Sequence, residues 1–196
     1  MTRTENFPAT KEFTMSQFRL IEPQQASPET RDQLEAIQSK LGRLPNMFKA
    51  MANSPATLSA YMGLSEAAAS GRLSPQLREQ VALTVSERNG CQYCLAAHSA
   101  VGKMLGLSSD EILNNRNAEA TDPSTAAALT FAAALVDKHG KVSEADIDAL
   151  SQAGLDDGLI AELVTATALT TLTNYFNLTA GTPIDFPRVE ALVATV

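Results

Sequence analysis

The sequence has 196 residues, of which 44% are apolar, and it carries a formal net charge of −7. A chain of this size and apolar content can bury a substantial core without disulfide bonds to stabilise it. Its acidic balance, with no run of lysine or arginine, argues against nucleic acid and acidic membrane surfaces as binding partners.

The N-terminal region shows no helical period. Residues 1–27 mix charged and aromatic side chains and lack the apolar core of a signal peptide, so we expect a cytoplasmic protein. Residues 1–20 are predicted to form a flexible arm, followed by a single all-helical domain over 21–196. The longest uncharged stretch, 163–184, is rich in threonine and asparagine, which are costly in lipid, so we interpret it as a buried helix and a turn.

From residue 27 onward, the chain carries regular signals for helix starts. Four pairs join a capping side chain to a proline suited to the first helical position: Ser27-Pro28, Ser54-Pro55, Ser74-Pro75 and Asp122-Pro123. They predict helices that end near Gly42, Gly71, Asn89 and Gly140. Further helices are predicted from Cys91 to Gly106, from Ser108, from Ser143 to Gly154, and from about 159 to 180.

No part of the sequence alternates apolar and polar residues as a strand does, so the predicted fold class is all-α. Residues 73–94 and 155–176 share a cap, an apolar helix and a polar-aromatic ending, which indicates a possible internal duplication. Several helices carry apolar faces, so we also expect a homo-oligomer.

Both cysteines and one of the two histidines lie within eight positions. On a helix, Cys91, Cys94 and His98 fall within about 60° of one another, so the three side chains share one face. A helix that begins near Cys91 also places both sulfurs at its positive end, where the amide groups stabilise a thiolate. The pattern therefore favours a reactive thiol pair.

Three other interpretations of this cysteine pair are possible. A thioredoxin-like site requires strands that the sequence lacks. A structural zinc site requires four ligands, whereas the other histidine, His139, is some forty residues away and suits a helix C-terminus. The third alternative is two buried cysteines beside a surface histidine.

The wider pattern resembles the alkylhydroperoxidase D-like (AhpD-like) group of the carboxymuconolactone decarboxylase family. The residues that carry this resemblance are Glu79, Ser86, Asn89-Gly90, Cys91-x-Tyr93-Cys94 and His98. The ending, from Asn174-Tyr175-Phe176-Asn177 to Pro187, is also similar to peroxidase-related members, so the likeness covers most of the chain after residue 20.

This resemblance implies an all-helical, oligomeric thiol peroxidase that uses no metal, flavin or other cofactor. It implies that Cys94 attacks a small hydroperoxide, that Cys91 resolves the resulting sulfenic acid as a disulfide, and that a dithiol or lipoyl-type reductant restores both thiols. His98 would polarise the Cys94 thiol, and Glu79 would complete a proton relay.

Two positions qualify this assignment. Taken alone, Glu79 is typical of a solvated acid in the first turns of a helix, and Glu87 is a second candidate for its role. Some family members carry a histidine where this chain has Tyr93, which relays protons poorly at neutral pH.

Two alternative functions are a lyase acting on γ-carboxymuconolactone and a redox-responsive binding protein with little turnover.

Overall fold

The structure is a computed structural model, and it describes residues 16–190 and 192. In this part of the chain it contains a short 3-10 helix, η1 (Pro23–Gln25), and nine α-helices. The α-helices are α1 (Pro28–Leu41), α2 (Asn46–Met51), α3 (Pro55–Ala69), α4 (Pro75–Arg88), α5 (Gln92–Met104), α6 (Ser109–Arg116), α7 (Pro123–Asp137), α8 (Glu144–Gln152) and α9 (Asp157–Ala180). No strand occurs among these residues, and the predicted all-α fold is confirmed.

The helix starts follow the capping signals in the sequence. The side chains of Ser27, Ser54, Ser74 and Asp122 each accept a hydrogen bond from the backbone N–H three positions on. Ser108 and Glu111 form a complete capping box at α6. One helix lacks such a signal: α2 begins after Pro45, in a segment for which only a turn was predicted.

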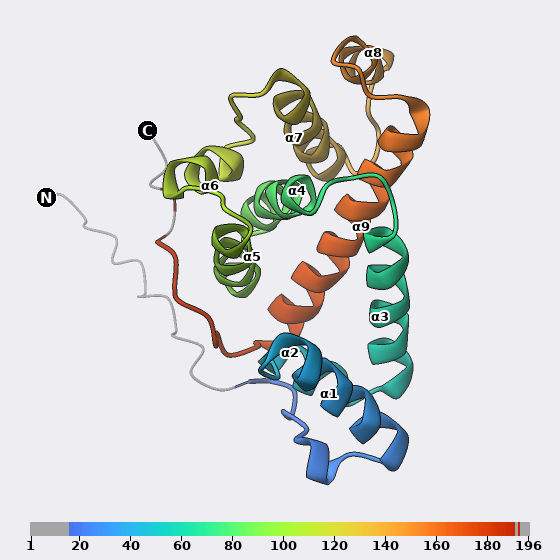
Figure 1. The fold of residues 1–196 in the computed structure, drawn as a ribbon, viewed down its shortest axis with the longest axis vertical. Helices are drawn as coiled ribbons and strands as arrows, with labels where there is room; N and C mark the ends of the chain where they lie inside the picture. The colour runs from blue at the N-terminus through green and yellow to red at the C-terminus, as the bar shows by residue number, and fades with distance from the viewer. Residues whose placement is uncertain (1–15, 191, 193–196) are drawn as a thin grey trace, which may run out of the picture.

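The long helix α9 runs through the centre of the molecule and organises the other helices (Figure 1). One apolar cluster joins α4, α7, α8 and α9, and includes Val85, Leu129, Leu150 and Leu163. A second cluster joins α1, α2 and α3 to the start of α5, and it includes Leu34, Met51, Leu58 and both cysteines. The cysteine pair is therefore part of a packed core and not of a surface loop.

After α9, the chain doubles back past α2 and α5 towards α6 (Figure 1). Asn46 anchors this return, because its N–H donates to Asp185 and its amide to the carbonyl of Pro183. Farther along, Arg116 donates to the carbonyl of Glu190. The returning segment therefore forms one wall beside the N-terminus of α5.

Residues 1–15 of the predicted arm lie outside the described residues. Within 16–20, the N–H of Gln17 donates to the carbonyl of Ala180 over 2.8 Å, and the ring of Phe18 meets the ring of Phe176 edge-on. This part of the predicted arm therefore packs on the end of α9.

The two segments of the possible duplication differ in one respect: α4 ends at Arg88 before the bend, whereas α9 continues without a break to Ala180. Among the described residues, no helix is both long enough and apolar enough to cross a bilayer.

Candidate functional site

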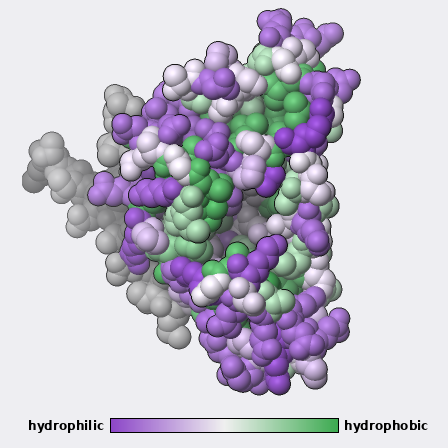
Figure 2. Space-filling view, viewed as in Figure 1, coloured by the Kyte–Doolittle hydropathy of each residue, from purple (hydrophilic) through white to green (hydrophobic). Residues whose placement is uncertain are grey.

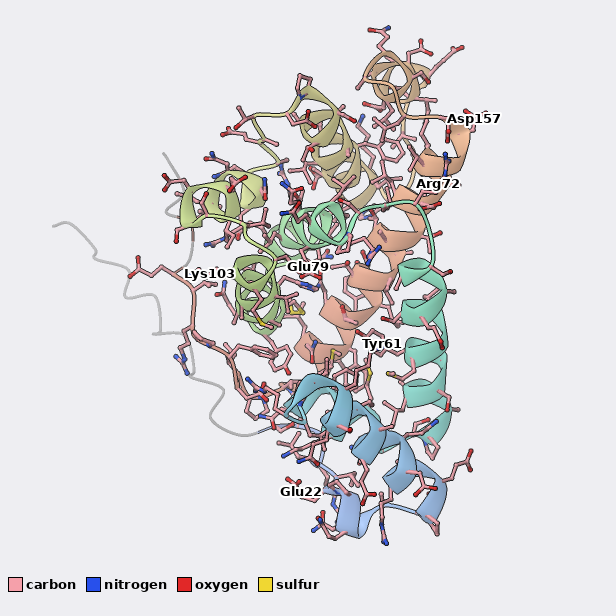
Figure 3. The ribbon with its side chains drawn as sticks, in the orientation of Figure 1. Glu22, Tyr61, Arg72, Glu79, Lys103 and Asp157 are labelled. Atoms are coloured by element: carbon pink, nitrogen blue, oxygen red, sulfur yellow. A yellow bond between two sulfur atoms is a disulfide. The ribbon has the colours of Figure 1, made fainter. Side chains whose placement is uncertain are left out.

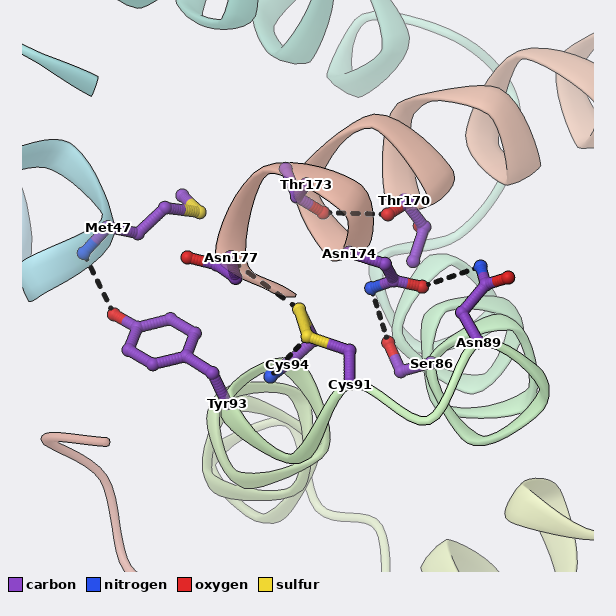
Figure 4. The surroundings of a disulfide bond; sticks show 10 residues. All are labelled: Met47, Ser86, Asn89, Cys91, Tyr93, Cys94, Thr170, Thr173, Asn174 and Asn177. Carbon is purple, nitrogen blue, oxygen red and sulfur yellow. Dashed lines mark hydrogen bonds between the residues drawn. A yellow bond between two sulfur atoms is a disulfide. The ribbon is translucent and has the colours of Figure 1, made fainter. Parts of the chain in front are cut away.

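The bend between α4 and α5 fixes the position of the cysteine pair. Gly90 has a φ of +67°, a left-handed conformation that glycine adopts at little cost, and the N–H of Cys91 donates to the carbonyl of Ser86. Asn174 of α9 holds the bend from the other side: its amide donates to the Ser86 hydroxyl, and its carbonyl oxygen accepts from Asn89 (Figure 4). Hydrogen bonds between α9, the end of α4 and the bend thus hold the turn that starts α5.

Both sulfurs lie at the N-terminus of α5 and are joined in a disulfide. Cys91 is the N-cap residue, and its sulfur accepts the N–H of Cys94 over 3.3 Å. The two residues are only 1% and 2% exposed. Asn177 of α9 donates its side-chain N–H to the Cys94 sulfur over 3.4 Å (Figure 4). The Asn177 N–H is thus the donor directed at the Cys94 sulfur, and the Cys94 backbone N–H is the donor directed at the Cys91 sulfur. Such donors stabilise negative charge on a reduced sulfur.

The structure brings Glu79 and His98 together, although they lie on different helices. Glu79 Oε2 is 2.8 Å from His98 Nδ1, and both side chains are partly buried. Figure 3 shows Glu79 where α4 meets α5, with Tyr61 across from it on α3. Because a carboxylate accepts hydrogen bonds and does not donate them, Nδ1 of His98 is the donor in this pair, and the pair leaves Nε2 unused.

These groups share one cavity of about 350 Å³. Its lining includes Cys94, His98, Glu79 and Tyr61, together with apolar side chains of α2, α5 and α9 and the ring of Phe186. In the space-filling view, the surface is hollowed between α5 and α3, and apolar side chains gather over α5 beside the hollow (Figure 2). The apolar side chains on α5 include Val101 and Met104, which are exposed to solvent.

Two tyrosines border the site, the partly buried Tyr61 and the buried Tyr93. Burial raises the pKa of Tyr61, and the negative charge of Glu79 adds to this rise, against a hydrogen bond with Ser65 that lowers it. Burial likewise raises the pKa of Tyr93, and so does the carboxylate of Asp185, whereas the Met47 N–H that donates to the phenol lowers it. Both phenols therefore stay neutral at physiological pH, and Tyr93 acts as a wall of the site and not as a base.

Glu87, the second candidate for the relay, lies outside the site. Its carboxylate is 2.7 Å from Arg116 Nε on α6, and Arg116 is itself 6% exposed. Glu87 therefore neutralises a buried cation on the side of α4 that packs against α6.

Asn174 and Asn177 are the site residues that sequence reasoning missed as a pair. Tyr175, between them, is more than half exposed. The available signal was the spacing of the two asparagines, three apart in the uncharged stretch 163–184, which places both amides on one buried face.

No group of three or more histidine, cysteine, aspartate or glutamate residues suited to a metal ion occurs within residues 16–190.

Comparisons with known proteins show a family match and structures of similar fold. Residues 55–138, a range that contains Glu79, both cysteines and His98, match the carboxymuconolactone decarboxylase family. The chain is similar to the alkylhydroperoxidase AhpD core, an uncharacterized peroxidase-related protein, from Ralstonia eutropha JMP134. The two share 27% identity over 87% of this chain and 92% of that chain, with a TM-score of 0.78.

Two further structures extend the comparison. An uncharacterized peroxidase-related protein from Silicibacter sp. TM1040 is 26% identical over 94% of this chain and 96% of that chain, with a TM-score of 0.75. The debrominase Bmp8, solved in complex with 2,3,4-tribromopyrrole, is 20% identical over 81% of this chain and 86% of that chain. Its TM-score of 0.70 shows a shared fold. No curated protein matches the chain. The resemblance to the AhpD-like group is confirmed.

Proposed function

We propose that this chain, which carries the carboxymuconolactone decarboxylase family match over residues 55–138, is a thiol peroxidase whose attacking sulfur is Cys94. One observation carries the proposal: Cys94, paired with Cys91, borders a cavity that also holds the hydrogen-bonded His98–Glu79 pair. A thiol, a base and a carboxylate that orients the base are the parts that an activated nucleophile requires.

In the first step, the Cys94 thiolate attacks the terminal oxygen of a hydroperoxide. A sulfur–oxygen bond forms and the oxygen–oxygen bond breaks, so the sulfur is oxidised to a sulfenic acid and the peroxide is reduced to an alcohol. The leaving alkoxide takes a proton, and we assign its supply to His98, whose imidazole holds the proton removed earlier from the Cys94 thiol.

In the second step, Cys91 attacks the sulfenic sulfur. A sulfur–sulfur bond forms, hydroxide leaves and takes up the Cys91 proton as water, and the disulfide is complete. The Cα atoms of the two cysteines are 5.3 Å apart, which suits this bond. A dithiol then reduces the disulfide, and two thiols are regenerated.

The cavity lining favours an organic hydroperoxide over hydrogen peroxide. Its walls are mainly apolar and include Phe48, Val101, Leu169 and Phe186. An alkyl or aryl tail gains by burying its surface there, about 25 cal/mol per Å² of apolar area, whereas hydrogen peroxide has no such surface. We therefore expect an apolar tail to lower KM.

The test is peroxide consumption by the purified protein with a dithiol donor, using cumene hydroperoxide and hydrogen peroxide. The Cys94→Ser variant should lose turnover, whereas Cys91→Ser, the matched control, should still consume about one equivalent of peroxide when the donor is left out. Full activity of Cys94→Ser overturns the assignment.

The alternatives predict different results. A lyase of the family would act on γ-carboxymuconolactone without either thiol. A redox-responsive binding protein would form the disulfide reversibly and change its assembly or binding without steady-state consumption of peroxide.

A further inference from the structure

A second cavity, of about 600 Å³, lies on the other side of the cysteine pair. Its lining includes Gly90, Cys91, Tyr93, Asn177 and the segment 181–184, with Arg188 and Leu178 among the remaining residues. Cys94 borders the first cavity and Cys91 borders the second, whereas Tyr93 borders both. The two cysteines of one disulfide therefore border different cavities, and Tyr93 lies in the wall of both.

Two buried polar atoms of this lining have no hydrogen-bond partner among the described residues. They are Oδ1 of Asn177, a residue that is 3% exposed, and Oγ1 of Thr182, a residue that is 7% exposed. An unpaired buried polar atom costs about 1–3 kcal/mol. Both residues line the second cavity, and Asn177 also donates its side-chain N–H to the Cys94 sulfur.

The charge of the lining points to an anionic occupant. Arg188 is the charged side chain of the second cavity, and within residues 16–190 it takes part in no ion pair. No carboxylate among the described residues lines this cavity, whereas the first cavity is lined by both Glu79 and Arg78. A ligand with a carboxylate group is therefore attracted to Arg188 in the second cavity.

We propose that the second cavity binds the reductant, a small dithiol that bears a carboxylate, and directs it to the sulfur of Cys91. The proposal rests on the thiol peroxidase function, and it adds the face of attack and the chemistry of the ligand. The cavity is present in the disulfide form of the chain, which is the form that a reductant must bind.

The exchange is balanced as follows. A thiolate of the reductant forms a bond to Cys91 Sγ, the bond between the cysteines breaks, and its electron pair stays on Cys94 as a thiolate. Asn177 already donates an N–H to that sulfur. The second thiol of the reductant then attacks the reductant sulfur bound to Cys91, closes a cyclic disulfide, and releases Cys91, which takes up the remaining proton. Cys94 is thus regenerated on the side of the cavity proposed for peroxide.

The test isolates the reductive half-reaction. The disulfide is prepared with diamide and without peroxide, so the result does not depend on whether the protein consumes hydroperoxides. Reduction is then followed by stopped flow with dihydrolipoate, which carries a carboxylate, and with dihydrolipoamide, which is neutral. Arg188→Gln should slow dihydrolipoate about two- to fivefold at low ionic strength and leave dihydrolipoamide unchanged, because an exposed ion pair contributes about 0.2–1 kcal/mol.

A steric variant provides the second arm. Leu178 is an exposed residue at the second cavity, and Leu178→Trp should slow reduction by both dithiols about tenfold or more, because exchange depends on access to the attacked sulfur. Leu172→Trp is the matched control, since Leu172 is an exposed leucine of α9 that borders neither cavity. Thermal melts of both variants establish that each is folded.

The attacked sulfur is identified with mercaptosuccinate, a monothiol that bears carboxylates. After brief mixing and alkylation, tandem mass spectrometry should find the monothiol on Cys91 and the alkyl group on Cys94. The reverse labelling overturns the proposal, and so does equal reduction of Leu178→Trp and Leu172→Trp. An effect of Arg188→Gln that is the same for both dithiols overturns the carboxylate assignment.

Discussion

The bend that presents the cysteines depends on Asn174, and Asn174→Leu tests this dependence at nearly constant volume. Asn174 is fully buried and hydrogen-bonds to Ser86 over 3.1 Å and to Asn89 over 2.9 Å. Loss of the Asn89 bond costs about 1 kcal/mol, because Asn89 can turn to water. The Ser86 hydroxyl is fully buried, and its unpaired state adds about 1–3 kcal/mol. The expected loss of unfolding free energy is therefore about 2–4 kcal/mol.

Urea denaturation measures this loss. The control is Asn117→Leu, the same substitution at an exposed asparagine, which should cost about 0.5 kcal/mol or less. Amide exchange gives a local readout, since the Cys91 N–H, which donates to the Ser86 carbonyl, should exchange faster in Asn174→Leu. A loss no larger than that of the control, with unchanged exchange at Cys91, would refute the role given to Asn174.

Three further predictions concern the surroundings of the sulfurs. Asn177→Leu should slow oxidation of the reduced protein by cumene hydroperoxide about tenfold in stopped-flow measurements, because a hydrogen bond to a charged group contributes about 1.5–3 kcal/mol. Above about pH 10, the free energy of unfolding of the wild type should fall with pH by up to about 1.4 kcal/mol per pH unit more steeply than that of Tyr93→Phe, which urea titrations at several pH values measure. The reason is that the pKa of Tyr93 is raised in the folded chain, so only the unfolded chain releases the phenol proton in this range. The contribution of Tyr93 to stability is therefore full below pH 10 and declines as the pH rises. Glu87→Ala should cost about 3–5 kcal/mol in urea denaturation, since it leaves Arg116 buried and unpaired, and should leave the rate of Cys94 oxidation unchanged.

Each of these predictions has a contrary outcome. Oxidation of Asn177→Leu at the wild-type rate would mean that its hydrogen bond does not stabilise the thiolate. An unchanged alkaline slope in Tyr93→Phe would mean that the phenol is accessible to solvent. A slower oxidation in a folded Glu87→Ala protein would return Glu87 to the list of relay candidates.

The sequence by itself determined most of the helical elements and the helix face that the cysteine pair shares with His98. Capping serines, prolines at the first helical position and terminal glycines are local signals, because they satisfy or restrict backbone groups within a few residues. The face shared by Cys91, Cys94 and His98 is equally local, since helix geometry alone fixes it. For the same reason α2, which has no capping side chain, was predicted only as a turn.

Only the tertiary structure decided which distant residues surround this pair. It turned Glu79 towards His98 and Glu87 towards Arg116, a choice that depends on how α4 packs between α5 and α6. It also brought Asn174 and Asn177 to the bend from a helix more than eighty residues away. The two cavities, one bordered by Cys94 and the other by Cys91, arise from the same packing. Such contacts depend on the three-dimensional path of the chain, and no pattern of nearby residues encodes them.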